Sequence, residues 1–286
     1  VNSGVATVTV ANPAPTIALT SPTSGSSFTA PATVNLAASV TANGNTITSV
    51  QFYNGSTLLG EDATSPYSLS WSGVTAGSYS VSARVVYGSG QPVNSESAMF
   101  TVLGVPEPWQ TADIGSVGVA GLADGGSDQM SVKGAGRLGG LSDGFRFVYQ
   151  TLSGDGEITV RLRGLETLGP DGRAGIMIRE TLADGARNAF VGLGPDRRSR
   201  WQFRSTTAGE TTTRVGGGLT PPECWLKLVR EGHRFTGFSS KDGVNWVQLG
   251  TRNMPLAVNI QMGLAVCSGD ESVLDSAVFV NPVAVP

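Results

Sequence analysis

The stretch that decides the fold runs from Phe145 to Glu180, FRFVYQTLSGDGEITVRLRGLETLGPDGRAGIMIRE. It contains three runs in which apolar and polar residues alternate, at 145–149, 157–162 and 174–179. A period of two puts successive side chains on opposite faces of an extended chain, so each run predicts a strand with one buried face. The connecting segments SGDG and GPDG are typical of tight turns, because glycine accepts a positive φ and proline fixes its own φ.

The same alternation recurs along the whole chain, and no window shows the long 3.6-residue period of a helix. The 286 residues include 39 Gly and 15 Pro, a composition typical of many short strands joined by turns. Seven strand-sized runs indicate an Ig-like sandwich over 15–104, and about a dozen antiparallel strands over 109–286 favour a two-sheet jelly roll. We therefore predict an all-β protein of two domains, joined by a proline-stiffened linker at 105–108.

Motifs in both domains resemble known families. The run VQFYNGSTLLGEDATSPYSLSWSGVTAGSYSVSARV, at 50–85, resembles the bacterial Ig-like modules that serve as spacers in secreted glycoside hydrolases. The motifs WQTADIG, GRAGIMIRE, CWLKLVREGHRFTGFSSKDGVNW and MGLAVCS are similar to the concanavalin A-like, or laminin-G-like, jelly rolls of secreted bacterial polysaccharide-degrading and surface proteins. These resemblances imply a spacer followed by a non-catalytic accessory module that binds a polysaccharide or a cell-surface glycan. The cysteines in the last two motifs depart from the family pattern.

Charge and hydropathy exclude two broad classes of protein. The formal net charge of −3 lacks the basic excess that a general nucleic-acid binder needs to displace counterions from phosphates. No apolar run reaches the roughly 18 residues of a membrane span, and no signal peptide opens the chain. We expect a removed signal or a start inside a longer protein, and the low charge and the scarcity of lysine favour an extracellular or cell-surface location.

Two cysteines, Cys224 and Cys267, form an even count. In an extracellular protein such a pair favours a disulfide, provided that the strands carrying the two residues are neighbours. The alternative is a pair of buried thiols that act as small hydrophobic side chains.

The sequence contains no convincing catalytic or cofactor motif. His233 is the only histidine and lies in a predicted turn, which disfavours a Ser-His-Asp triad. The glycine pattern at 134–139 fits a dinucleotide fingerprint, but a strand follows it where a helix is required. Glu157 and Glu180 are carboxylates on strands, yet they do not form a persuasive acid/base pair. We predict no enzyme and no cofactor; loop aspartates leave structural calcium as an option that no ligand-spacing motif supports.

A binding face remains as the functional hypothesis. Arg179 shares a strand face with Met177, and this face continues through Gln202 and Arg204, or through Trp201 on the opposite parity. Arginine can grip a carboxylate in a bidentate manner and an aromatic ring can stack on a sugar, so we expect these residues to bind a glycan. The competing interpretation places the aromatic residues, among them Trp225 and Trp246, in the core and leaves the arginines to solvate outer faces.

An additional strand and linker are predicted over 1–14. The run VATVTV could complete a sheet in its own chain, or Val5, Val8 and Val10 could insert into the next molecule as a donor strand. Exchange of Val1–Val10 would make the chain a subunit of a homopolymeric extracellular fibre or adhesin. This structural role is the alternative to the glycan-binding module.

Overall fold

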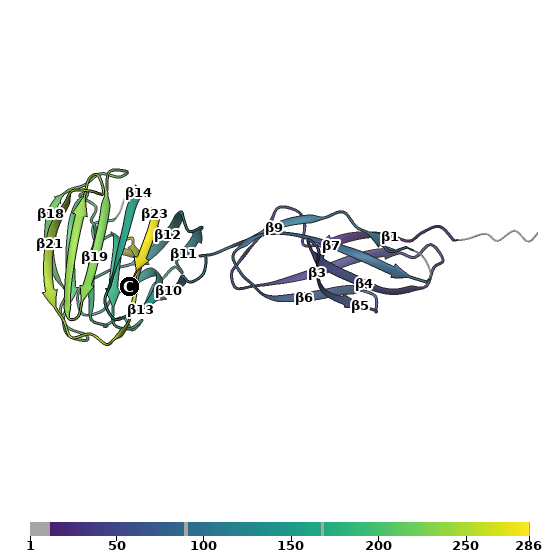
Figure 1. Ribbon diagram of the computed structural model, residues 1–286, viewed down its shortest axis with the longest axis horizontal. Helices are drawn as coiled ribbons and strands as arrows, with labels where there is room; N and C mark the ends of the chain where they lie inside the picture. The colour runs from purple at the N-terminus through teal and green to yellow at the C-terminus, as the bar shows by residue number, and fades with distance from the viewer. Residues whose placement is uncertain (1–11, 89–90, 167–168, 286) are drawn as a thin grey trace, which may run out of the picture. The chain divides into compact units, whose positions relative to one another are not determined.

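The computed structural model describes residues 12–88, 91–166 and 169–285 (Figure 1). All regular elements in these ranges are strands, and no described helix is long and apolar enough to cross a membrane. The chain divides between Gly104 and Val105 into two compact units. The fold is all-β, with an Ig-like sandwich followed by a two-sheet sandwich of the jelly-roll type. The candidate donor residues Val5, Val8 and Val10 lie outside the described ranges, so strand exchange stays a prediction.

The Ig-like unit packs a three-stranded sheet, in the order β1-β3-β6, against a six-stranded sheet, in the order β2-β9-β7-β4-β5 with β8 on β7. The strands are β1 (Thr16–Ser21), β2 (Ser26–Thr29), β3 (Ala32–Thr41), β4 (Ile47–Asn54), β5 (Thr57–Asp62), β6 (Tyr67–Val74), β7 (Gly77–Tyr87), β8 (Val93–Asn94) and β9 (Ala98–Leu103). Alternate residues from both sheets, such as Leu36, Phe52 and Phe100, form one buried core. Trp71 and Tyr79 extend this core through ring contacts with Phe100.

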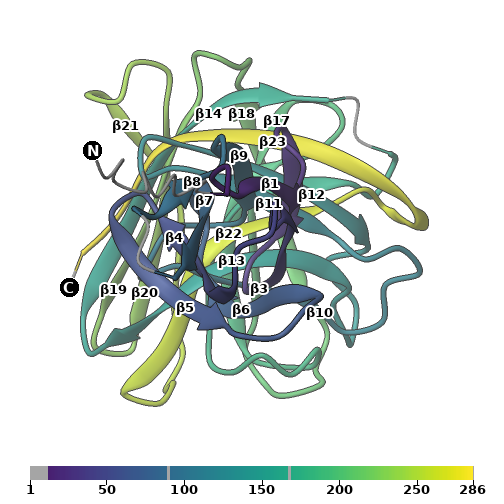
Figure 2. The same cartoon turned by 90° about the vertical axis from the view of Figure 1, so that its right-hand side faces the viewer.

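The jelly-roll unit contains two seven-stranded sheets. Its strands are β10 (Gln110–Ile114), β11 (Leu122–Gly125), β12 (Gln129–Gly136), β13 (Phe145–Ser153), β14 (Gly156–Leu165), β15 (Arg173–Arg179), β16 (Asn188–Leu193), β17 (Arg198–Arg204), β18 (Thr212–Gly218), β19 (Trp225–Glu231), β20 (Arg234–Ser240), β21 (Trp246–Asn253), β22 (Asn259–Cys267) and β23 (Asp270–Val285). We call β10-β13-β22-β15-β16-β17-β18 the first sheet and β11-β12-β23-β14-β19-β20-β21 the second sheet. Figure 1 shows the second sheet in this order, and Figure 2 shows the long curved β23 in yellow.

Side-chain alternation divides the first sheet into two apolar faces. Ile176 and Ile178 of β15 pack in the main core with Leu226 and Phe235 of the second sheet. The intervening Met177 points the opposite way, into a smaller core that holds Phe145, Phe147, Phe190 and Leu138 among others. We call the side of the first sheet that faces away from the second sheet the covered face. This side is also buried. The long aromatic and aliphatic runs of β13 and β15 are therefore buried on both faces.

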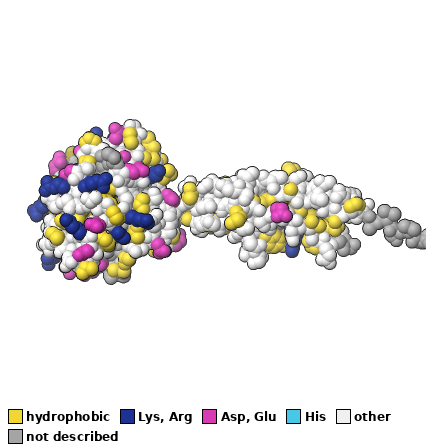
Figure 3. Space-filling model, turned by 90° about the horizontal axis from the view of Figure 1, so that it is seen from above, with side chains coloured by type: hydrophobic (Ala, Val, Ile, Leu, Met, Phe, Trp, Pro, Cys, Tyr) yellow, Lys and Arg dark blue, Asp and Glu magenta, His cyan; other side chains and the backbone are white. Residues whose placement is uncertain are grey.

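The outer face of the second sheet contacts no third layer of strands in the described part of the chain. In the view of Figure 3, many lysine and arginine side chains lie on the surface of the jelly-roll unit, and the Ig-like unit shows very few charges. The sequence over 1–104 contains only four charged residues, Glu61, Asp62, Arg84 and Glu96, so charged residues are concentrated in the jelly roll.

Candidate functional site

The predicted binding arginines lie on the covered face. Arg179, which ends β15, and Arg204, which ends β17, both have an exposed fraction of 0%. Asp143 lies between them: its Oδ1 and Oδ2 accept bonds of 2.8 and 2.7 Å from Nη2 and Nη1 of Arg204, and its Oδ2 lies 3.6 Å from Nη1 of Arg179. Asn188 donates to the same carboxylate at 3.2 Å. The two arginines and one aspartate form a buried, charge-assisted network.

Two connecting segments cover this network. Segment 137–144 supplies Asp143 and the Gly140 carbonyl oxygen, which accepts a bond of 3.1 Å from Arg204. Segment 181–187 supplies carbonyl oxygens, among them that of Thr181, which accepts from Nε of Arg179 at 2.7 Å. Burial lowers the pKa of Arg179 to about 10, and the negative charge of Asp143 opposes this decrease. Through these bonds the network anchors the two segments to the sheet.

The expectation that Arg179, Arg204, Gln202 and Trp201 bind a glycan is therefore corrected. Gln202 is 2% exposed and donates to Thr213, and Trp201 is 1% exposed and packs in the main core. The alternation correctly separates Trp201 from the other three, which share the covered face. It contains no information about the segments that bury that face, and no polysaccharide can reach these side chains in this structure.

The expected disulfide is not formed. Cys224 packs in the main core, whereas Cys267, the last residue of β22, lies on the covered face. Both thiols are free, because the first sheet separates the two cores. Burial raises the pKa of each thiol to about 12. The alternative interpretation, two buried thiols, describes the structure.

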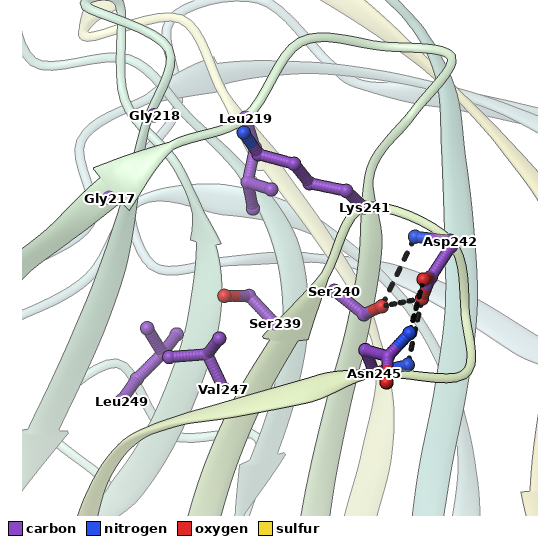
Figure 4. Close-up of a pocket in the computed structure, with 10 residues that line it drawn as sticks. All are labelled: Gly217, Gly218, Leu219, Ser239, Ser240, Lys241, Asp242, Asn245, Val247 and Leu249. Carbon is purple, nitrogen blue, oxygen red and sulfur yellow. Dashed lines mark hydrogen bonds between the residues drawn. The ribbon is translucent and has the colours of Figure 1, made fainter.

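A cleft opens at the sandwich edge where the first sheet ends at β18 and the second at β21 (Figure 4). Its volume is about 350 Å³, and Leu219, Val247 and Leu249 form much of its apolar lining. Lys241, Asp242 and Asn245 of the β20–β21 turn lie at its rim. Asp242 is the only carboxylate in the lining, so the cleft does not supply the pair of carboxyl groups that glycoside hydrolysis requires.

Asp242 has a structural task in this turn. Its carboxylate accepts bonds from the backbone N–H of Val244 at 2.9 Å and of Asn245 at 2.8 Å, and from the Asn245 side chain at 2.7 Å. These bonds, led by that from the Asn245 backbone, hold the pKa of Asp242 well below its usual range. The hairpin that joins β20 to β21 is thus fixed by its own side chains.

The outer face of the second sheet carries a band of aromatic and cationic side chains next to this hairpin. We call Arg161, Trp225, Lys227, Phe238 and Trp246 the outer-face band. All five are partly exposed, in contrast to the buried neighbours Leu226 and Leu228.

Register brings the members of the band together. Arg161 of β14 pairs with Trp225 of β19, which pairs with Ser240, which in turn pairs with Trp246. Neighbouring strands lie about 4.8 Å apart, so the backbones of Trp225 and Trp246 are about 10 Å apart with one strand between them. In the adjacent row Lys227 pairs with Phe238. Two indole rings are thus aligned across the strands on a face that solvent reaches.

Cations are held against these rings. The guanidinium carbon of Arg161 lies 4.7 Å from the Trp225 ring centroid, and Nζ of Lys227 lies 4.6 Å from that of Trp246. These distances are typical of cation–π contacts, which restrict both partners. The competing interpretation of the sequence placed both tryptophans in the core, and the sequence hypothesis did not include them in a binding face. The signal that would have found them is the alternation in Trp225-Leu226-Lys227-Leu228, where the two leucines identify the inward parity.

The candidate catalytic and metal-binding residues do not converge. Glu157 lies in β14 of the second sheet, whereas Glu180 follows β15 of the first sheet and is ion-paired with Arg187. The bond from Arg187 lowers the pKa of Glu180, the opposite of what a general acid needs. His233 is exposed in the turn between β19 and β20. Among the described residues, no cluster of three or more His, Cys, Asp or Glu could hold a metal ion.

Comparisons with known proteins give one family match, which lies in the Ig-like unit. Residues 15–83 match the bacterial Ig domain family. No curated protein matches the chain in sequence. The fibronectin(III)-like modules of Clostridium thermocellum CbhA are 31% identical over 30% of this chain and 94% of that one, with a TM-score of 0.30. A functionally unknown Saccharomyces cerevisiae protein is 15% identical, over 57% and 91%, with a TM-score of 0.47. The Bacillus licheniformis β-glucanase is 12% identical, over 62% and 90%, with a TM-score of 0.40.

Proposed function

We propose that the chain is a non-catalytic, extracellular pair of modules from a larger secreted or surface protein. In this proposal the Ig-like unit is a spacer, and the jelly roll binds a polysaccharide. The observation that carries the proposal is the outer-face band, where Trp225 and Trp246 are aligned on an accessible sheet face. Sugar rings have apolar faces that stack on aromatic side chains, and their hydroxyl groups bond to neighbouring polar groups.

The rest of the jelly roll supports binding rather than hydrolysis. Glu157 and Glu180 lie on different sheets, and the edge cleft contains a single carboxylate. An acid/base pair must face one substrate from two sides of a cleft. The composition of the Ig-like unit, with very few charges on the visible surface in Figure 3, suits a spacer.

The test is co-sedimentation of the full chain with a panel of insoluble and cross-linked polysaccharides. We expect Trp225→Ala and Trp246→Ala each to weaken binding by up to about tenfold, because each variant removes a stacking surface. Val244→Ala is the matched control, since it removes an exposed apolar side chain from the same hairpin without removing a ring. Circular dichroism should show that all three variants are folded.

The proposal would be overturned by a parent chain that binds no polysaccharide in the panel. Binding that survives in the double variant Trp225→Ala/Trp246→Ala would move the site away from the outer-face band. Release of reducing sugars that is abolished by Glu157→Gln or Glu180→Gln would contradict the non-catalytic assignment.

A further inference from the structure

The cations of the outer-face band are unpaired. No carboxylate in the described part of the chain lies within 4.0 Å of a side-chain nitrogen of Arg161 or Lys227. Other arginines of the jelly roll do have such partners: Arg146 lies 3.2 Å from Asp113, and Arg200 lies 2.8 Å from Asp196. Exposed arginines elsewhere on this unit, such as Arg163, Arg214 and Arg234, also lack an ion-pair partner among the described residues. The band differs from them because its two cations lie against accessible indole rings.

Much of the hydrogen-bonding capacity of these cations is also unused. Arg161 donates from Nε to the carbonyl oxygen of Pro222 at 2.9 Å, and its two terminal nitrogens have no partner among the described residues. Lys227 donates no hydrogen bond to a described residue, although its Nζ lies near the rings of Trp246 and Phe238. A guanidinium with two free nitrogens has the geometry for a bidentate contact with a carboxylate.

Three acidic residues lie close to the band in sequence or register, Asp242, Glu157 and Glu223, and none forms an ion pair with its cations. Asp242, in the adjoining turn, accepts bonds from Val244, Asn245 and Ser240. Glu157 lies on β14 in a row further along the strand, where it pairs with Val229. Among the described residues, the band therefore presents positive charge beside two aromatic rings, with no carboxylate within 4.0 Å of a side-chain nitrogen of either cation.

We infer that the outer-face band binds an acidic polysaccharide, one whose sugar rings carry carboxylate groups. In this mode the rings of a polyuronate stack on Trp225 and Trp246, and the terminal nitrogens of Arg161 and the ammonium of Lys227 contact the carboxylates. The inference rests on the proposed function and names the class of glycan for the same site. A planar carboxylate matches the fork of a guanidinium better than a hydroxyl group does.

The test uses a pair of probes that differ only in charge, polygalacturonate and its methyl ester, in affinity gel electrophoresis of the full chain. We expect polygalacturonate to retard the protein and the ester to retard it at least about fivefold less, because esterification removes the carboxylate. Retardation should also weaken as salt rises from low to physiological concentration.

Variants locate the effect. Arg161→Gln and Lys227→Gln should each weaken binding to polygalacturonate by about three- to tenfold, and Arg161→Lys should recover part of the loss. Lys133→Gln is the matched control: Lys133 is an exposed cation of β12 in the same sheet, and its loss should leave binding unchanged.

Failure of this inference differs from failure of the proposed function. Equal retardation by both probes, or tryptophan-dependent binding to neutral glucans alone, would overturn the acidic class and leave polysaccharide binding intact. Stronger retardation by a sulfated dextran than by polygalacturonate would overturn the carboxylate assignment. Unchanged binding in Arg161→Gln and Lys227→Gln would overturn the roles of these residues. A chain that no polysaccharide retards would overturn both proposals.

Discussion

Asp143 shows how much a single side chain can decide in this protein. It is 3% exposed and is the only acidic side chain that contacts Arg179 and Arg204 directly in the described structure. Removing one partner of a buried charge network leaves the others desolvated without compensation, a loss of about 3–5 kcal/mol. We expect Asp143→Asn to lower the free energy of unfolding of the jelly roll by this amount, measured by urea denaturation with tryptophan fluorescence.

The matched control is Asp171→Asn. This variant removes an ion pair with a similar distance between nitrogen and oxygen, but one that is exposed to solvent. Arg137 and Asp171 lie 3.1 Å apart with side chains 67% and 56% exposed, so water and salt screen their attraction. We expect the urea midpoint to stay nearly constant in this variant. A comparable decrease in both variants would show that burial does not set the effect of Asp143.

At this scale the sequence predicted parity but not burial. It separated Gln202 and Arg204 from Trp201, because strand alternation is a local property, but it left open which of the two parities continues the face of Arg179. The sequence pattern could not reveal that Asp143, in the glycine-rich segment 137–144, contacts the covered face and helps to bury it. Contacts between residues far apart in the chain leave no periodic signal. The accessibility of Trp225 is a different case, because the alternation of β19 does indicate its outward parity.

At the scale of elements, the β20–β21 hairpin depends on close approach of its backbone to a large core ring. A Cβ added to Gly250 would lie 2.6 Å from Cδ1 of Trp201, closer than atoms can approach without movement. We expect Gly250→Ala to destabilise the jelly roll by about 1–3 kcal/mol, because the hairpin or the indole must shift. The same urea experiment measures this change.

Gly217→Ala, in β18 of the first sheet, provides the control, because a Cβ there would meet no atom within 4 Å. Its midpoint should remain close to that of the parent chain. Strand existence was predictable where alternation is clear, which is why the runs at 145–149, 157–162 and 174–179 lie within β13, β14 and β15. The need for glycine at position 250 could not be predicted from the sequence, because it arises from packing between the two sheets.

At the scale of the whole molecule, the sequence indicated two β-units from the composition of their connections and from two resemblances. The pairing of the cysteines depended on which strands become neighbours, and this topology separates Cys224 from Cys267. The same topology decides which faces of the sheets remain open to a ligand. Function was therefore less predictable than fold.

The free thiols give a direct test of this topology. We expect no reaction of the native chain with a thiol reagent at pH 8, because both cysteines are 0% exposed and burial raises their pKa values to about 12. In denaturant both thiols should react, and a reducing agent should leave the unfolding midpoint unchanged. A denatured, unreduced chain without reactive thiols would show that a disulfide had formed.

The buried network on the covered face also has a consequence for how this sequence can change during descent. A single substitution at Asp143, Arg179 or Arg204 leaves a buried charge without its partner, which lowers the stability of the fold. Replacement of all three residues by apolar residues of similar volume leaves no such unpaired charge, so it need not lower the stability. These positions should therefore covary among related jelly rolls. Some lineages should retain all three charges, and others should have lost all three together.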